Sequence, residues 1–145
     1  MISLKDYTLI DDCYNANPVS MRAAIDLLQM ADAPRVAILG DMFELGQNSD
    51  EMHAGVGSYA ADSLVECVIC VGENSRHMYE AARSQRSVKG HEDQVIYFET
   101  KEQLLLALQE RKQELLPEGS TILVKASHGM GFAEVIEKLS GNILP

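Results

Sequence analysis

Residues Tyr7–Met21, YTLIDDCYNANPVSM, pass from a short apolar run through a polar segment into a helical pattern. The run Tyr7–Ile10 is nearly continuous in apolar residues, which is typical of a strand buried on both faces of a sheet. Asn17 and Pro18 then indicate a helix start, because asparagine caps a first turn well and proline suits its first position. The stretch predicts a strand that leads directly into a helix.

The same alternation recurs along the whole chain. Further buried strands are predicted at Arg35–Leu39, Cys67–Val71, Val95–Phe98 and Thr121–Val124. Helical periodicity or start signals predict helices after Pro18, from Asn48 with Glu51 through about Asp62, over Ser75–Arg86, over Lys101–Leu115, and from Phe132 through Leu139. Arg86–Gln94 is polar and predicts a mobile loop. We therefore expect one α/β domain over residues 1–145, a Rossmann-like three-layer sandwich with a mostly parallel sheet and helices on both faces.

Composition limits the possible functions. The 145 residues are 46% hydrophobic, which fits a soluble globular domain. The net charge of −10 repels phosphate backbones, so no nucleic-acid partner is expected. No apolar run approaches the roughly 20 residues of a membrane span. The chain also shows no secretory leader, so the expected location is the cytoplasm, with no membrane partner.

Cys67 and Cys70 have the spacing of a metal or redox motif, but they fall inside a predicted strand. Residues three apart on a strand point to opposite faces of the sheet. The pair is therefore expected to pack in the core, as free cysteines usually do.

Three segments rich in polar residues follow predicted strands: Asp11–Pro18, Gly40–Gly46 and Lys125–Gly131. The carboxyl ends of parallel strands meet at one edge of a sheet, where ligands of such folds bind. The segments offer carboxylates for sugar hydroxyls, a lysine for an anion, and a helix N-terminus at Gly129–Phe132 for a carboxylate or phosphate. The sequence has no P-loop and no nucleophile motif. It therefore predicts a binding edge without a complete catalytic centre.

Each of these residues also has a structural interpretation. Asp12 could cap the turn, and Lys125 could be a solvated residue at a strand end. His53 is either an ordinary surface residue of its helix or a member of the site. The coincidence of three polar strand ends at one edge favours a site.

The segments DDCYNANPVSM (Asp11–Met21), GDMFELG (Gly40–Gly46) and HAGVG (His53–Gly57) resemble the C-terminal domain of the Mur ligases. Within that family they resemble the type that adds D-alanyl-D-alanine to UDP-N-acetylmuramoyl-tripeptide. Lys125–Met130, KASHGM, resembles a third family motif but carries Ala126 and His128 where the family usually has glycine and arginine. The arginine contact made in the family is therefore in doubt, because a neutral imidazole does not bind a carboxylate with two hydrogen bonds.

The resemblance implies a cytoplasmic, ATP-dependent ligase of peptidoglycan synthesis with three domains. An N-terminal domain would bind UDP-N-acetylmuramoyl-tripeptide, and a central domain would hold most of the ATP and Mg²⁺; neither is part of this chain. ATP would phosphorylate the tripeptide carboxylate, and the amine of D-alanyl-D-alanine would attack the acyl phosphate. This chain would close over the site, in contact with its own N-terminal and central domains, and would be inactive alone.

The resemblance also implies roles for single residues. Asp12 matches the aspartate that binds the ribose hydroxyls of the nucleotide. The loops that face the amino substrate supply the expected substrate-binding residues, which are Asp41, Glu44, Lys125, Ser127 and His128. Lys125 is expected to bind the dipeptide carboxylate. Asn15 and Asn17 are either substrate contacts or residues that shape the turn, and no catalytic residue or metal ligand is expected.

Two other functions remain open at this point. One is a stand-alone nucleotide- or metabolite-binding α/β module. The other is a domain of a folylpolyglutamate-type or cyanophycin-type ligase. The extra residue in DCYNANP and the GDMFELG segment favour the dipeptide-adding type.

Overall fold

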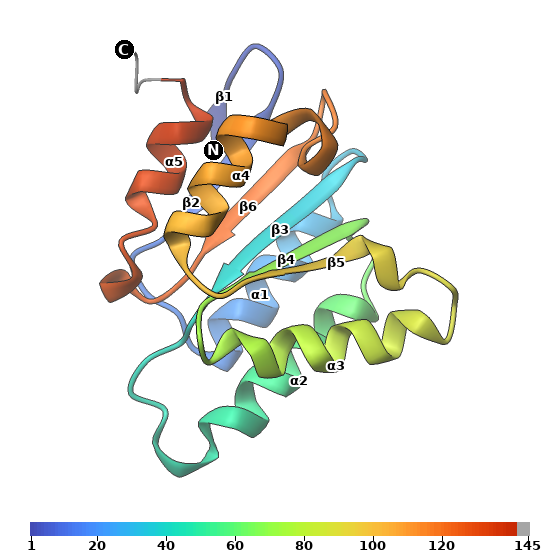
Figure 1. Ribbon diagram of the computed structural model, residues 1–145, viewed down its shortest axis with the longest axis vertical. Coiled ribbons are helices and arrows are strands. Elements are labelled where there is room, and N and C mark those ends of the chain that lie inside the picture. Colours follow the sequence, from blue (N-terminus) through green and yellow to red (C-terminus); the bar gives the residue numbers. More distant parts are fainter. Residues whose placement is uncertain (142–145) are drawn as a thin grey trace.

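The computed structural model describes residues 1–141 and shows strands and helices in alternation (Figure 1). The strands are β1 (Ile2–Ser3), β2 (Thr8–Asp12), β3 (Arg35–Gly40), β4 (Cys67–Val71), β5 (Val95–Phe98) and β6 (Thr121–Lys125). The helices are α1 (Pro18–Gln29), α2 (Ser49–Ala61), α3 (Ser75–Ser87), α4 (Lys101–Leu115) and α5 (Ala133–Leu139). Short 3₁₀ turns lie at Gly46–Asn48, Glu92–Gln94 and His128–Met130.

The strands form one sheet in the order β1-β2-β6-β3-β4-β5. Every neighbouring pair is parallel except β1 with β2. Apolar residues of α1, α2 and α3 pack on one face of the sheet, and those of α4 and α5 pack on the other (Figure 1). The predicted three-layer α/β sandwich with a mostly parallel sheet is confirmed.

The central strands are buried on both faces, as their apolar runs predicted. In β3, Val36 and Ile38 belong to the core cluster beneath α4 and α5, whereas Ala37 and Leu39 belong to the cluster beneath α1 to α3. The alternation follows from the two-residue period of a strand. Both layers of helices are therefore held by the same short strands.

Several boundaries differ from the prediction by one or two residues. Strand β2 ends at Asp12 instead of Ile10, because its pairing with β6 continues until Asp12 lies beside Lys125. Asp12 therefore belongs to a strand and not to the turn. Strand β1 was not predicted, since two residues are too few to show a period.

Asn17 caps α1 as predicted. Its side chain accepts a hydrogen bond from the Ser20 amide, and the Ser20 hydroxyl accepts one from the Asn17 amide. The predicted start of α2 is right in position but wrong in cause. Asn48 makes no capping hydrogen bond with its side chain, because a 3₁₀ turn over Gly46–Asn48 runs directly into the helix.

Helices α2 and α3 lie side by side on one face of the sheet (Figure 1). Gly57 of α2 permits this close approach, because a Cβ atom there would lie 2.1 Å from the carbonyl oxygen of Met78 on α3. A side chain at this position would force the two helices apart.

The helix predicted over Ser75–Arg86 is confirmed and extends one residue further, to Ser87, so the loop predicted for Arg86–Gln94 begins later than expected. Arg86 lies in the last turn of α3 and is buried. Its guanidinium donates to the carbonyl oxygens of Ala60 and Ala61 at the end of α2, and to those of Val65 and Glu66 that follow. Burial lowers the pKa of Arg86 from its ordinary value. Arg86 thus connects the end of α3 to the segment between α2 and β4.

The cysteine prediction is confirmed. Cys67 packs against the core cluster beneath α4 and α5, and Cys70 lies in the opposite cluster. The two thiols therefore belong to different layers of the core.

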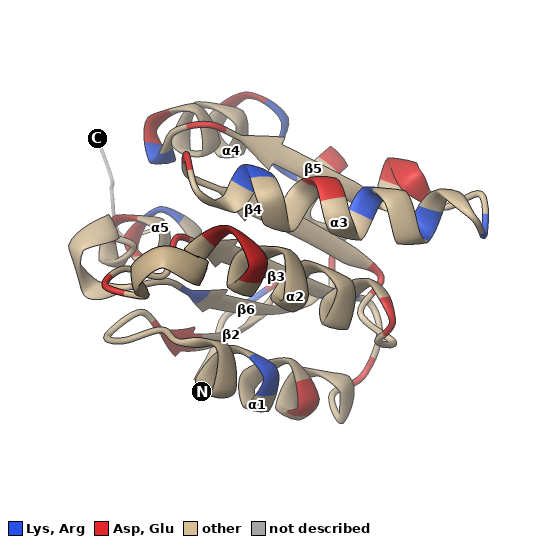
Figure 2. Cartoon of the chain, turned by 90° about the horizontal axis from the view of Figure 1, so that it is seen from below, with Lys and Arg blue, Asp and Glu red and all other residues tan. Residues whose placement is uncertain are grey.

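The surface is acidic, with 22 Asp and Glu against 12 Lys and Arg in the sequence. Figure 2 shows acidic positions on α1, α2 and α3 as well as in loops. Among the described residues, the structure contains no helix with the length and apolar character needed to cross a membrane.

Candidate functional site

The ends of β2, β6 and β3 diverge at one edge of the sheet. The segments after β2 and β3 lead to α1 and α2 on one face, whereas the segment after β6 leads to α5 on the other. Such a change of direction between neighbouring parallel strands opens a crevice outside their carboxyl ends. Asp12, Asp41 and Lys125 lie at these strand ends, so the structure brings the three polar segments together.

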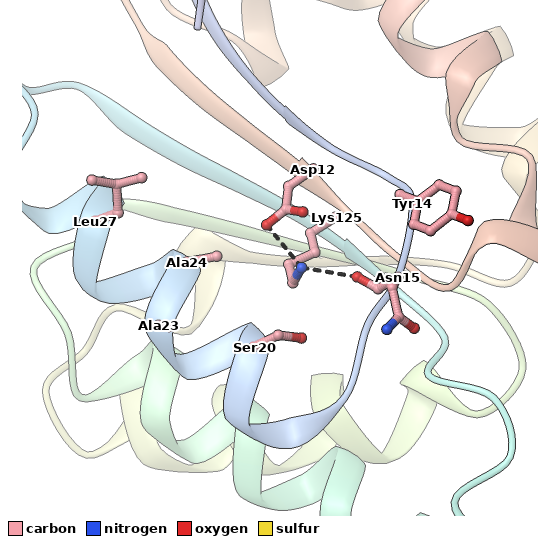
Figure 3. Close-up of a pocket in the computed structure, with 8 residues that line it drawn as sticks. All are labelled: Asp12, Tyr14, Asn15, Ser20, Ala23, Ala24, Leu27 and Lys125. Atoms are coloured by element: carbon pink, nitrogen blue, oxygen red, sulfur yellow. Dashed lines mark hydrogen bonds and ion pairs between the residues drawn. The ribbon is translucent and has the colours of Figure 1, made fainter.

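Asp12 and Lys125 form an ion pair at the floor of this crevice (Figure 3). The Lys125 Nζ lies 2.8 Å from Asp12 Oδ2 and 2.9 Å from the carbonyl oxygen of Asn15. The lysine side chain is 2% exposed and the aspartate side chain 43% exposed. A buried ammonium needs such partners, because leaving water without them is costly. Lys125 is therefore not a solvated residue.

A pocket of about 420 Å³ opens beside the ion pair (Figure 3). Asp12 and Lys125 lie on one side of it, and helix α1 contributes Ala23, Ala24 and Leu27 on the other. Its other lining residues are Tyr14, Asn15 and Ser20. The pocket thus combines a charged floor with an apolar wall.

The wall was missed by the sequence analysis. Leu27 is half-exposed on a helix whose buried side is formed by Met21, Ala24, Ile25 and Leu28. In the sequence, an exposed leucine that follows two alanines by one helical turn, as Leu27 follows Ala23 and Ala24, could have indicated this wall.

The two asparagines shape the turn between β2 and α1. The side-chain oxygen of Asn15 accepts a hydrogen bond from the amide of Ala16. The main-chain carbonyl oxygen of Asn15 accepts one from Lys125. Asn17 is occupied in the cap of α1. The contacts of both residues agree with the structural interpretation, although Asn15 also lines the pocket.

Asp41 is buried and binds the start of α3. One of its oxygens, Oδ1, accepts from the Ser75 amide at 2.8 Å and from the Ser75 hydroxyl at 2.7 Å, and Oδ2 accepts from the Asn74 amide at 3.3 Å. A negative charge at a helix N-terminus is stabilising. Gly72 leaves room for this carboxylate, because a Cβ atom there would lie 2.3 Å from it.

Ser127 joins the segment after β6 to the segment after β3. Its amide donates to the Asp41 carbonyl oxygen at 3.0 Å, and its hydroxyl accepts from the Phe43 amide at 2.8 Å. Glu44, the next residue, is exposed and has a positive φ of 60°. The paired segments therefore present Glu44 to solvent from a firmly held turn.

His128 lies in a 3₁₀ turn, His128–Met130, and its ring is 5.5 Å from that of Tyr14. Helix α5 begins at Ala133 with Phe132 as its N-cap, one residue later than predicted, and has seven residues. The 3₁₀ turn and the left-handed Gly131 occupy the segment where that helix start was expected.

His53 is buried, so its interpretation as a surface residue is wrong. Its Nε2 accepts a hydrogen bond from the Met42 amide at 3.0 Å, and its Nδ1 lies 2.8 Å from the Ser49 carbonyl oxygen. A carbonyl only accepts, so Nδ1 is the donor of this contact. His53 thereby attaches the segment after β3 to helix α2.

Within residues 1–141, no group of three or more histidine, cysteine or acidic side chains is arranged to hold a metal ion. The edge offers carboxylates, the ammonium of Lys125 and backbone groups as hydrogen-bonding partners.

Comparisons with known proteins identify the family. Residues 1–128 match the family described as the glutamate ligase domain of Mur ligases. The UDP-N-acetylmuramoyl-tripeptide–D-alanyl-D-alanine ligase of Escherichia coli (strain K12) is 35% identical over 134 residues, which are 92% of this chain and 27% of that protein. The enzyme of the same name from Bacillus subtilis (strain 168) is 31% identical over 91% of this chain and 28% of its own length.

Solved structures show the same fold. A crystal structure of MurF from Acinetobacter baumannii superposes with a TM-score of 0.80 at 29% identity, covering 96% of this chain and 29% of that one. The MurF ligase of Thermotoga maritima, solved in complex with ADP, gives a TM-score of 0.73 at 21% identity over 96% of this chain and 29% of that one, which supports the fold alone. The chain spans less than a third of the length of these relatives. The family match extends from the first strand to the loop after β6, and this chain belongs to the Mur ligase family as a glutamate ligase domain.

Proposed function

We propose that this chain is the C-terminal domain of an ATP-dependent ligase that joins D-alanyl-D-alanine to UDP-N-acetylmuramoyl-tripeptide. The relatives named above carry that activity in their names. The observation that carries the proposal is the meeting of three polar strand ends, after β2, β3 and β6, at the edge of the sheet where ligands of this architecture bind.

The domain supplies only part of an active site. Its sequence has no P-loop, and the lysine of the crevice is already paired with a carboxylate. These groups fit the sugar end of a nucleotide and do not form a triphosphate site. A central domain would therefore hold most of the ATP and Mg²⁺, an N-terminal domain would bind the UDP-linked tripeptide, and the full enzyme would work in the cytoplasm.

Asp12 would bind the ribose of the nucleotide. Its Oδ2 is engaged by Lys125, and its half-exposed carboxylate borders the pocket, so Oδ1 can accept from a sugar hydroxyl. Bound to the C-terminal domain at the ribose and to the central domain at the phosphates, ATP would hold the two domains closed.

The segments after β3 and β6 would border the incoming dipeptide. Glu44 and His128 have side chains that solvent reaches, so they can contact it directly. Asp41 and Ser127 would act through the shape of the segments, because their polar atoms already bind backbone groups. Binding of the dipeptide carboxylate by Lys125 stays a prediction. The contacts that Lys125 makes with Asp12 and Asn15 favour a different role.

The contribution of this domain to catalysis would be positioning. Formation of the acyl phosphate and attack by the dipeptide amine both require reacting groups held in line and shielded from water. Closing the domain over the central domain would bring the edge of the sheet against the reacting groups. None of the residues of this chain would act as the nucleophile.

An assay of the complete reading frame tests the proposal. We expect release of phosphate from ATP that requires both UDP-N-acetylmuramoyl-tripeptide and D-alanyl-D-alanine, with the UDP-linked pentapeptide seen by mass spectrometry. Turnover with a folate and glutamate instead would identify the folylpolyglutamate type. Nucleotide binding without any ligation would identify a stand-alone module, and either result would overturn the proposal.

A further inference from the structure

Lys125 is among the largest fully buried side chains of the protein, yet it borders the pocket at the edge of the sheet. It lies at the end of β6, directly beside Asp12 in the register of β2 with β6. Its ammonium approaches two oxygen atoms, the Asp12 carboxylate and the Asn15 carbonyl. The lysine thus connects the end of one strand to the turn that follows its neighbour.

The ammonium retains one donor for a ligand. A lysine side chain has three N–H groups, and two are directed to the oxygens of Asp12 and Asn15. Asp12 retains an acceptor in the same way, because Oδ1 accepts no hydrogen bond from residues 1–141. Both residues line the same pocket (Figure 3). One donor and one acceptor therefore lie side by side at its floor.

The charge of the pocket determines which ligand suits this pair. Asp12 and Lys125 are the two charged side chains that line the pocket, and their charges cancel. An anionic carboxylate bound to Lys125 would lie close to the carboxylate of Asp12 and would be repelled by it. A neutral ligand with two adjacent hydroxyl groups has no such penalty, since one hydroxyl can donate to Asp12 while the other accepts from Lys125.

We propose that Lys125 is a specificity-determining residue of the nucleotide site, and that with Asp12 it binds the two neighbouring hydroxyls of the ribose. This inference rests on the proposed function, in which the ribose lies at this edge. Ala23, Ala24 and Leu27 of α1 form the apolar wall against which the rest of the nucleoside packs. The contact with Asn15 keeps the turn after β2 in place, so Lys125 also positions Asp12.

Kinetics of the full-length ligase that contains this domain test the proposal. The substrates are ATP and its two deoxy analogues, each lacking one of the vicinal ribose hydroxyls. For the unaltered enzyme we expect kcat/KM to fall by about tenfold to a hundredfold with each analogue, because a buried charged partner loses its hydrogen bond. Lys125→Met should raise the KM for ATP by about tenfold or more and should reduce the discrimination against one analogue, while the KM for the dipeptide changes by less than about twofold.

Two further variants sharpen the result. Lys138→Met removes a lysine that binds the Gln109 side chain between α4 and α5, and it should leave every kinetic constant unchanged. Asp12→Asn should raise the KM for ATP as Lys125→Met does. The double variant should cost much less than the sum of the two, because Asp12 and Lys125 act on the ribose as one unit.

Other outcomes would overturn the proposal. A rise in the dipeptide KM with an unchanged ATP KM would make Lys125 the ligand of the dipeptide carboxylate. Equal use of ATP and both analogues by the unaltered enzyme would show that the ribose is not recognised here, and this measurement decides the matter even if Lys125→Met does not fold. If the enzyme shows no dipeptide-dependent turnover, the proposed function fails, whereas calorimetric affinities of the same protein for ATP and the analogues still decide the role of Lys125.

Discussion

Asp41 accepts three hydrogen bonds from Asn74 and Ser75 at the start of α3. Asp41→Asn keeps its shape but replaces one of the two carboxylate oxygens by a donor and removes the charge at the start of α3. We expect the free energy of unfolding to fall by about 1–3 kcal/mol in a urea titration. Asp32→Asn, on an exposed turn, is the matched control and should change it by less than about 0.5 kcal/mol.

The thiols provide a second prediction at this scale. Burial, the hydrogen bond to Asp11 and nearby carboxylates raise the pKa of Cys13 to about 12, and burial raises the pKa of Cys67 to about 11. Because the thiolate is the reactive form, alkylation of the folded protein at pH 8 should be at least about tenfold slower than that of the urea-unfolded chain.

The pH dependence has a definite sign. Alkylation of Cys13 in the folded protein should keep rising with pH towards about 12, whereas the unfolded chain should level off near the ordinary thiol value of 9.0. Folding favours the protonated thiols, so their contribution to stability is complete below pH 9.0 and is lost as the pH rises through the folded values. Mass spectrometry of each cysteine checks the rates, and a plateau near pH 9 in the folded protein would contradict the raised pKa.

At the scale of elements, α2 contains two glycines with opposite expectations. A Cβ atom at Gly57 would collide with the backbone of α3 at Met78, whereas one at Gly55 would meet nothing within 4 Å. Gly57→Ala should lower the free energy of unfolding by about 3 kcal/mol or more, since α3 must move. Gly55→Ala should raise it by about 0.5–1 kcal/mol, because alanine is the better helix former. Equal effects of the two substitutions in thermal unfolding would show that the helices do not pack as described.

The elements were the part of the structure that the sequence predicted best. Apolar runs in β4 and β5 and the helical pattern of α4 carry their own local information, so their predicted bounds agree with the structure. The failures have different causes. Strand β2 extends through two carboxylates because its pairing with β6 continues until Asp12 lies beside Lys125, which is 113 positions away in the chain. Helix α2 begins without a side-chain cap because a 3₁₀ turn over Gly46–Asn48 runs directly into it.

The candidate site shows the same division. Its expected location at the ends of β2, β3 and β6 followed from topology, and the ribose as a ligand of Asp12 is what the family resemblance implied. The hydrogen-bond partners did not follow, because polar residue types alone do not show which donors are already occupied. Asp41 binds the start of α3, and Lys125 binds Asp12, and both contacts depend on packing between segments distant in the chain. The cap of α1 by Asn17 could be predicted, because its partner Ser20 is only three residues away.

At the scale of the whole molecule, the sequence has polar segments at one edge of the sheet and no P-loop. We expect the isolated chain to have no ligase activity and to bind ATP with a dissociation constant well above about 100 μM, because the phosphates would lack partners. Isothermal titration calorimetry measures this directly. Binding of ATP at about 1 μM to the isolated chain would contradict the division of the site between domains.

The place of β2 in the sheet has a consequence for the order of folding. Apart from the two residues of β1, β2 is held by one neighbour, β6, and the contact between Asp12 and Lys125 spans 113 positions of the chain. Contacts that close so large a loop form late, because the chain entropy lost is not recovered until the strands meet. Strand β2 should therefore dock last and open first, and amide hydrogen exchange at Leu9–Asp12 should be faster than in β3. A nucleotide bound at Asp12 would then slow that exchange, because it would stabilise the state in which β2 is paired with β6.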